Sequence, residues 1–206
     1  MLLALLLTGC WESRTERSIR LLREGDAETR RQAARDLGET ESRPAVETVP
    51  GLAAALGDSD PDVRRLAAFA LGRLGPEADD ALPALRTALA DEQEPVRLAA
   101  AYAINGIDPT DEAVVPVLAA AARRGEVRAI VALGRMGPHA AAAAPDLARA
   151  LRSRMPLVRV KSAEALGAIG PAAKASAPAL RRALGDPDDD VRLAAEAALR
   201  SIEPGP

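Results

Sequence analysis

The sequence has very few of the residues on which most catalytic and metal-binding sites depend. Among its 206 residues there is one cysteine, Cys10, one histidine, His139, and three aromatic residues, Trp11, Phe69 and Tyr102. A zinc site built from cysteine and histidine needs three or four such ligands, and an intramolecular disulfide needs two cysteines. No Ser-His-Asp, paired-carboxylate or phosphate-loop arrangement can be assembled either. We therefore expect no catalytic residue, no cofactor and no metal, and we expect His139 to be an exposed residue at a helix start.

An excess of positive charge is lacking as well. The 27 Lys and Arg residues are outnumbered by 30 Asp and Glu residues, and the formal net charge is −3. Such a chain does not attract a phosphate backbone, so we expect no nucleic-acid partner. Alanine, by contrast, supplies nearly a quarter of the chain. A core of alanine and aliphatic residues with almost no rings requires closely packed backbones, and strand-forming residues are scarce, so composition favours an all-α fold.

The amino terminus carries a pattern of its own. Residues 1–10 read MLLALLLTGC, an apolar run that ends in Leu-Thr-Gly-Cys. This resembles a bacterial lipoprotein signal, which implies a signal peptide over residues 1–9 and a lipidated Cys10 followed by a short tether to residue 20. The lipid would hold the protein in the membrane of the bacterial cell envelope, on its extracytoplasmic side. The alternative is an apolar helix end that packs on the first repeat, with Cys10 an incidental buried thiol.

The rest of the chain repeats itself. The segment DPDVRRLAAFALGRLGP at 60–76 returns in related form at 93–109, 154–171 and 188–204. Prolines that precede each copy of this segment are spaced 33, 33, 29 and 33 residues apart, beginning at Pro50. A fixed period of this length indicates stacked helical repeats. The predicted repeat region is 12–204, with units at about 12–43, 44–76, 77–109, 110–138, 139–171 and 172–204.

Each unit predicts two helices. The first carries apolar residues at helical spacing, such as Leu82 and Leu85, and it ends at a turn rich in Asp, Gly and Pro. The second runs from a Val-Arg pair to an ending in which Gly75 and Pro76, or their counterparts, stop the helix. Gly72 and its counterparts are expected to let neighbouring helices approach closely. The proline of each first helix either begins that helix or bends it.

On these motifs the units resemble HEAT repeats of the short, alanine-rich kind found in phycobilisome-lyase-type proteins. The resemblance implies a right-handed, armadillo-like α-solenoid of about six helical pairs, with the second helices on the concave face. It also implies a ladder in which arginines pair with turn aspartates of neighbouring repeats. The fourth unit is four residues short and has Arg-Arg-Gly-Glu at 123–126 in place of the acidic turn, so we expect an altered curvature there. The expected ladder residues are Arg64, Arg97, Arg159 and Arg192 with Asp58 (or Asp60), Asp91 and Asp186.

Exposed positions of the second helices form the expected binding face. Positions two, six and ten after the valine of each unit lie on one helical stripe. Phe69 and Tyr102 occupy position six, and aromatic rings are enriched at binding hot spots. The alternative is that both rings merely cover a seam between neighbouring helices. The predicted partner-binding residues are Phe69, Tyr102, Arg31, Arg35, Arg65, Arg73 and Leu98.

Together these features predict a noncatalytic, monomeric scaffold that binds a protein partner along its concave face and is tethered to the bacterial envelope by lipid. The alternative is a cytosolic HEAT-like accessory or lyase subunit that acts on a bilin-carrying protein. A third hypothesis, DNA binding as in HEAT-like glycosylases, conflicts with the acidic net charge. In the last unit Glu196 and Arg200 replace small internal residues, so we expect residues 189–202 to form a polar C-terminal cap.

Overall fold

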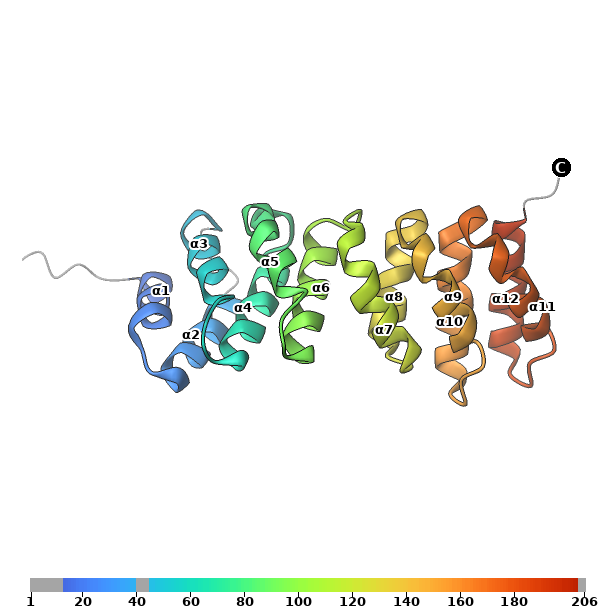
Figure 1. Cartoon of the computed structure of the whole chain (residues 1–206), viewed down its shortest axis with the longest axis horizontal. Helices are drawn as coiled ribbons and strands as arrows, with labels where there is room; N and C mark the ends of the chain where they lie inside the picture. Colours follow the sequence, from blue (N-terminus) through green and yellow to red (C-terminus); the bar gives the residue numbers. More distant parts are fainter. Residues whose placement is uncertain (1–12, 40–44, 204–206) are drawn as a thin grey trace, which may run out of the picture.

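The computed structural model describes residues 13–39 and 45–203 (Figure 1). Throughout these two ranges the regular structure is helical and no strand occurs, so the predicted all-α fold is confirmed. None of the helices in this part of the chain is both long and apolar enough to cross a membrane. The predicted signal peptide, Cys10 and Trp11 lie outside the described residues.

The helices follow one another in pairs. We call the even-numbered helices the second helices, and the side of the molecule that they line the second-helix face. Short 3-10 segments precede four of the first helices: η1 (Gly75–Ala81), η2 (Glu112–Val114), η3 (Gly137–Ala143) and η4 (Gly170–Ser176). The pairs are α1 (Arg14–Glu24) and α2 (Ala27–Glu39), α3 (Ala45–Ala55) and α4 (Pro61–Leu74), α5 (Leu82–Ala88) and α6 (Glu94–Ile107), α7 (Val115–Arg123) and α8 (Val127–Met136), α9 (Ala144–Ala150) and α10 (Pro156–Ile169), and α11 (Ala177–Ala183) and α12 (Asp189–Ile202).

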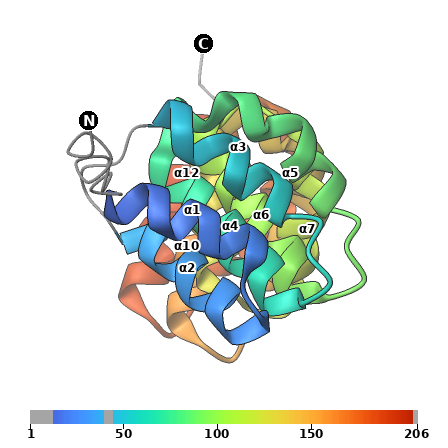
Figure 2. The same cartoon turned by 90° about the vertical axis from the view of Figure 1, so that its left-hand side faces the viewer.

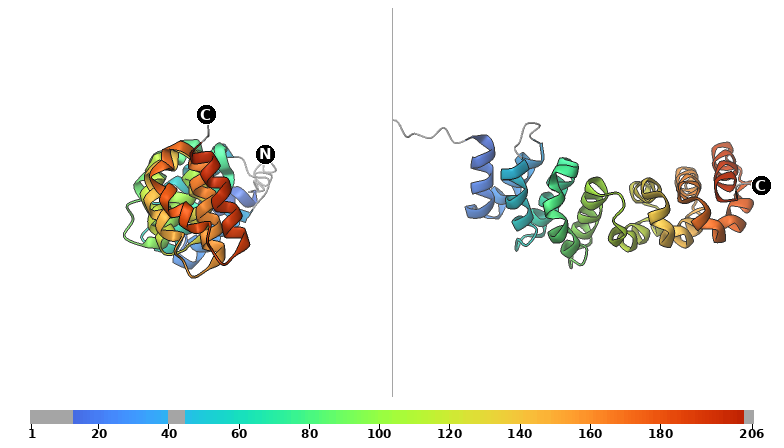
Figure 3. Two further views of the ribbon diagram at one scale, coloured as in Figure 1. Left: turned by 90° about the vertical axis from the view of Figure 1, so that its right-hand side faces the viewer. Right: turned by 90° about the horizontal axis from the view of Figure 1, so that it is seen from above.

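The six pairs stack side by side in one row. Figure 1 shows them in chain order from α1 to α12, and the view from above in Figure 3 shows that the row bends into a shallow arc. Seen from the amino-terminal end in Figure 2, successive pairs lie one behind another. The chain is therefore an α-solenoid, as expected, in which each pair touches only its neighbours in the row.

The structure decides the role of the prolines. Pro83, Pro116, Pro145 and Pro178 stand in the first turn of α5, α7, α9 and α11, where the amide that proline lacks has no helical partner. These prolines therefore begin their helices. Pro50 differs, because it lies inside α3.

Small residues allow the second helices to pack closely. Val63, Ala67, Ala70 and Leu71 of α4 are fully buried. A Cβ atom on Gly72 would lie 2.9 Å from the Cα atom of Ala103 on α6, and the same contact joins Gly167 to Ala198 of α12 at 3.0 Å. The expected close approach at these glycines is confirmed. Each can be replaced only if the neighbouring backbone moves.

The carboxyl-terminal end carries the predicted polar pair. Arg200 donates to Glu196 at 2.6 Å, with 67 and 56% of the two side chains exposed, so both face solvent as expected for a cap. The end is not wholly polar, because Leu184 and Leu193 are also exposed there. No seventh unit covers these leucines in the described chain.

Candidate functional site

Arginine-aspartate pairs connect successive units. Nε and Nη2 of Arg64 donate to the two carboxylate oxygens of Asp91 at 2.7 and 2.9 Å, while Nη1 donates to the backbone oxygen of Asp58 in its own unit at 2.9 Å. We call such a connection a rung. Arg159 and Asp186 form a second rung, with distances of 2.8 and 2.7 Å.

The rungs are buried ion pairs whose aspartates have lowered pKa values. The side chains of Arg64 and Asp91 are each only 10% exposed. The hydrogen bond from Arg64 lowers the pKa of Asp91, and that from Arg159 lowers the pKa of Asp186. Paired donors on a planar guanidinium also fix the direction of the carboxylate. Each rung thus sets how one turn sits against the next.

Two of the predicted rungs are wrong and one was missed. Arg97 donates to the backbone oxygens of Asp91 and Glu92 in its own turn, but it meets no carboxylate in the described residues, because the shortened fourth unit lacks the acidic turn. Arg192 lies in the last unit and pairs with Asp189 of its own helix. The partner of Asp58 is Arg30, at 2.7 and 2.8 Å. Its signal was the Thr-Arg pair that stands where later units have Val-Arg.

The seam between the third and fourth units, which we call the third seam, is unlike the others. Every other consecutive pair of second helices is in extended contact, whereas α6 and α8 barely touch. Helix α8 has 10 residues, against 14 in α4, α6, α10 and α12. Asn105 stands where the neighbouring units have Gly72 or Gly134, and its buried Nδ2 atom has no hydrogen-bond partner among the described residues.

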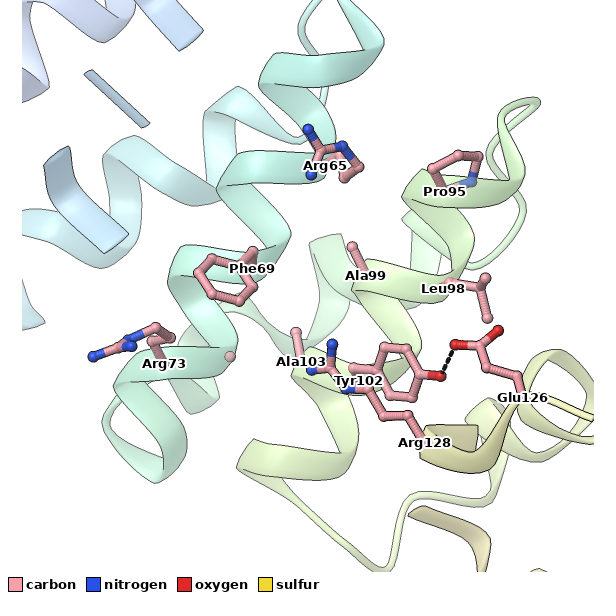
Figure 4. Close-up of a pocket in the computed structure, with 11 residues that line it drawn as sticks. Arg65, Phe69, Arg73, Pro95, Leu98, Ala99, Tyr102, Ala103, Glu126 and Arg128 are labelled. Carbon is pink, nitrogen blue, oxygen red and sulfur yellow. Dashed lines mark hydrogen bonds between the residues drawn. The ribbon is translucent and has the colours of Figure 1, made fainter. Parts of the chain in front are cut away.

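A cavity of about 300 Å³ opens on the second-helix face over α4, α6 and the start of α8 (Figure 4). Five of the seven predicted partner-binding residues line it, which is a convergence that the spacing of the stripe predicted. Glu126 and Arg128 also line the cavity and were missed, because they belong to the irregular fourth unit. The five predicted residues are Arg65, Phe69, Arg73, Leu98 and Tyr102.

The two rings of the cavity have different environments. Phe69 is 45% exposed and makes the open wall of the cavity. Tyr102 is partly buried, its hydroxyl donates to the Glu126 carboxylate, and the guanidinium of Arg128 lies 4.0 Å from its ring centre (Figure 4). Burial, and then the bond to Glu126, raises the pKa of Tyr102. Tyr102 therefore covers the third seam, while Phe69 stays exposed on the surface.

Two predicted binding residues lie elsewhere. Arg31 donates to Asp60 at 3.2 and 2.6 Å and to Glu28 at 2.8 Å, so it joins α2 to the start of α4. The hydrogen bond from Arg31 lowers the pKa of Asp60 to about 2. Arg35 is exposed on α2, with a single weak contact to Gln32 at 3.4 Å. Of the two, only Arg35 remains available on the surface.

Metal-binding geometry does not arise in the described part of the chain. Across 13–39 and 45–203, no group of three His, Cys, Asp or Glu side chains could hold an ion. His139 is exposed, with Nδ1 3.4 Å from a Glu112 carboxylate oxygen.

Comparisons with known proteins agree with this architecture. A family model described as HEAT repeats matches residues 16–104, 49–130 and 126–200. No curated protein matches the chain. A designed armadillo repeat protein in complex with the peptide (KR)4 is 18% identical, with a TM-score of 0.71 over 92% of this chain and 100% of that one. An engineered protein is 23% identical, with a TM-score of 0.70 over 93 and 97% of the two chains.

One solved structure that the chain resembles belongs to an enzyme. It is the complex of CpcE and CpcF of phycocyanin lyase from Nostoc sp. PCC7120, 26% identical with a TM-score of 0.60. The match covers 91% of this chain and 76% of that one. Because the HEAT-repeat model matches nearly the whole chain, this chain belongs to the HEAT-repeat family.

Proposed function

We propose that the chain is a noncatalytic scaffold that binds a protein partner on its second-helix face, centred on the cavity over α4, α6 and α8. The observation that carries this proposal is the convergence of Phe69, Leu98 and three arginines on one open cavity. Aromatic and arginine side chains dominate binding hot spots. A solenoid presents such residues on an extended surface without needing a catalytic centre.

Site-specific photocrosslinking in the producing cells tests this proposal. A photoreactive phenylalanine analogue replaces Phe69 in the full chain, and the same analogue replaces Leu184, which is 41% exposed on the turn after α11, as the control. We expect one discrete partner protein to be crosslinked from position 69 and not from position 184. Equal labelling from both positions would contradict the proposal.

We further propose that lipid on Cys10 tethers the scaffold to the bacterial envelope. The support is the order Leu-Thr-Gly-Cys at residues 7–10 and the position of Cys10 outside the repeat register. The test is metabolic labelling with a radioactive fatty acid in the wild type and in Cys10→Ser. Label and membrane sedimentation should both be lost in the variant while its helical content is kept. If the variant still sediments with membranes after a high-salt wash, the proposal of a lipid tether on Cys10 is wrong.

A second candidate function is an accessory role in bilin attachment, favoured by the similarity to the phycocyanin lyase complex. In this case the second-helix face would hold a bilin-carrying protein. Incubation with a phycocyanin apo-subunit and free bilin, followed by absorbance and denaturing electrophoresis, decides the point. A covalent adduct that depends on this chain would replace the noncatalytic proposal.

A further inference from the structure

The arginines of the cavity differ from those of the rungs, because none of them binds a carboxylate of another unit among the described residues. Arg73 is exposed and makes no hydrogen bond or ion pair with any described residue. Arg128 stacks on the Tyr102 ring and likewise meets no carboxylate in the described chain. Arg65 is held only by Asp62 of its own helix, at 2.9 Å, with 39 and 54% of the two side chains exposed. Such an exposed pair stabilises the protein little and is easily exchanged.

Local charge in the cavity is opposite to that of the whole chain. Three arginines and one glutamate line the cavity, whereas the chain as a whole has a net charge of −3. Glu126 already accepts the hydroxyl of Tyr102, so it is partly engaged. Arg128 lies over the Tyr102 ring face, an arrangement that leaves the N–H groups of a guanidinium free for a carboxylate. The arginines of the cavity thus provide hydrogen-bond donors that could bind the carboxylates of a ligand.

The floor of the same cavity is apolar. Phe69 is 45% exposed, and Leu98, Ala99 and Ala103 of α6 line the surface beside it. A volume of about 300 Å³ accommodates a few side chains of a segment but not a folded element. Arginines around an apolar floor are complementary to a segment in which acidic and apolar residues stand next to each other.

We propose that the cavity over α4, α6 and α8 binds an acidic segment of the partner protein, with an apolar side chain against Phe69 and Leu98 and carboxylates on Arg73 and Arg128. The inference rests on the proposed function and adds the chemistry of the partner. Guanidinium groups bind carboxylates through paired hydrogen bonds, and such pairs fix register. Because the arginines lie at a solvated rim, binding should weaken as ionic strength rises.

Fluorescence anisotropy on the full chain tests the inference with defined probes. The probes are a short labelled peptide that alternates glutamate and leucine, a matched peptide of lysine and leucine, a matched peptide of glutamate and serine, and a single-stranded oligonucleotide of equal negative charge. We expect the glutamate-leucine probe to bind at least about tenfold more tightly than the other three, as expected when charge and apolar contacts are both required. Equal binding of the lysine-leucine probe, or tighter binding of the oligonucleotide, would overturn the assignment.

Charge reversal at one position sharpens the test. Arg73→Glu should lower the affinity for the glutamate-leucine probe by about tenfold and raise that for the lysine-leucine probe. Arg182→Glu on α11 reverses an exposed arginine far along the row and serves as the matched control, with no expected change. An unchanged affinity in Arg73→Glu overturns the inference.

The same variant separates this inference from the scaffold proposal. A partner that is crosslinked at position 69 in wild-type and Arg73→Glu chains alike would overturn the acidic segment and leave the scaffold standing. No partner at position 69 in either chain would overturn both. Loss of crosslinking in Arg73→Glu, with crosslinking kept in Arg182→Glu, supports both.

Discussion

Two neighbouring seams built from the same repeat differ in how their second helices pack. The seam between the second and third units is closed, since α4 and α6 are in extended contact, whereas the third seam is open, since α6 and α8 barely touch. In the former, Gly72 lies against Ala103 and Arg64 binds Asp91 through two hydrogen bonds. In the third seam an asparagine, Asn105, takes the place of the glycine, and Arg97 finds no carboxylate among the described residues. The helical pattern alone therefore does not bring consecutive second helices into extended contact. A glycine packs against the next second helix at every closed seam, whereas the seam between α8 and α10 closes without a rung among the described residues.

The candidate site lies mainly over the closed seam between α4 and α6, and it reaches the open third seam at Glu126 and Arg128. The third seam leaves Tyr102 as a cover between the units, with Glu126 and Arg128 of the fourth unit around it. The irregular fourth unit thus contributes one charged edge of the candidate site.

Removing a rung arginine should have the largest effect on stability. Arg64→Ala leaves the buried carboxylate of Asp91 without its partner, which costs about 3–5 kcal/mol when the pair is buried. Arg97→Ala removes the same side chain from the third seam, where it binds only backbone oxygens, and should cost about 1 kcal/mol. Urea denaturation followed by circular dichroism compares the two. Equal losses would mean that the rungs do not distinguish the seams.

Moving the third-seam residue into a closed seam should have the next largest effect. Gly72→Asn forces a side chain into a space where even a Cβ atom would lie 2.9 Å from the Cα atom of Ala103. Overpacking of this kind costs about 1–3 kcal/mol. The control is Gly57→Asn, in a turn where the Cβ atom meets only an ordinary contact with the Ala54 oxygen at 3.5 Å. Thermal unfolding of the two variants should separate them clearly.

The sequence predicted the helical pairs because their signals are local. Apolar spacing, the Val-Arg pairs and the glycine endings each act within one unit, and so does the i, i+4 stripe that placed Phe69 and Arg73 on one face. The rungs are harder to predict, because each one depends on an arginine of one unit and a turn aspartate of the next. Arg97 follows a valine at the start of its helix, as Arg64 does, and the missing acidic turn of the following unit removes its partner. Asn105 takes the place of a glycine, and its effect on the seam is visible only in three dimensions.

Removing the unpaired amide of the third seam should stabilise the protein. Asn105→Ala eliminates a buried Nδ2 atom without a partner and improves helix propensity, and we expect a gain of about 1 kcal/mol. Gln32→Ala on the exposed side of α2 is the control for helix propensity. A loss of stability in Asn105→Ala would show that the amide makes a contact on which the seam depends.

Acid should selectively weaken the seams that carry a rung. Because the folded-state pKa of Asp91 is below its ordinary value of 3.8, its contribution is complete above that value and is lost as the pH falls through the lowered one. Asp91→Asn should therefore be less stable at neutral pH and less sensitive to acid than the wild type. Glu77→Gln, which removes an exposed carboxylate on η1, is the control variant. Urea midpoints at several pH values below neutrality make the comparison.

Hydrogen exchange of the free protein, resolved by residue, tests the central claim most directly. Helix α8 is the shortest second helix, has no rung to either neighbour in the described chain and barely touches α6. We predict that protection among helices α4 to α12 is lowest in α7 and α8 and high in α4 and α10, because local opening follows the loss of buried contacts. Uniform protection from α4 to α12, or a minimum at a seam that carries a rung, would contradict the account.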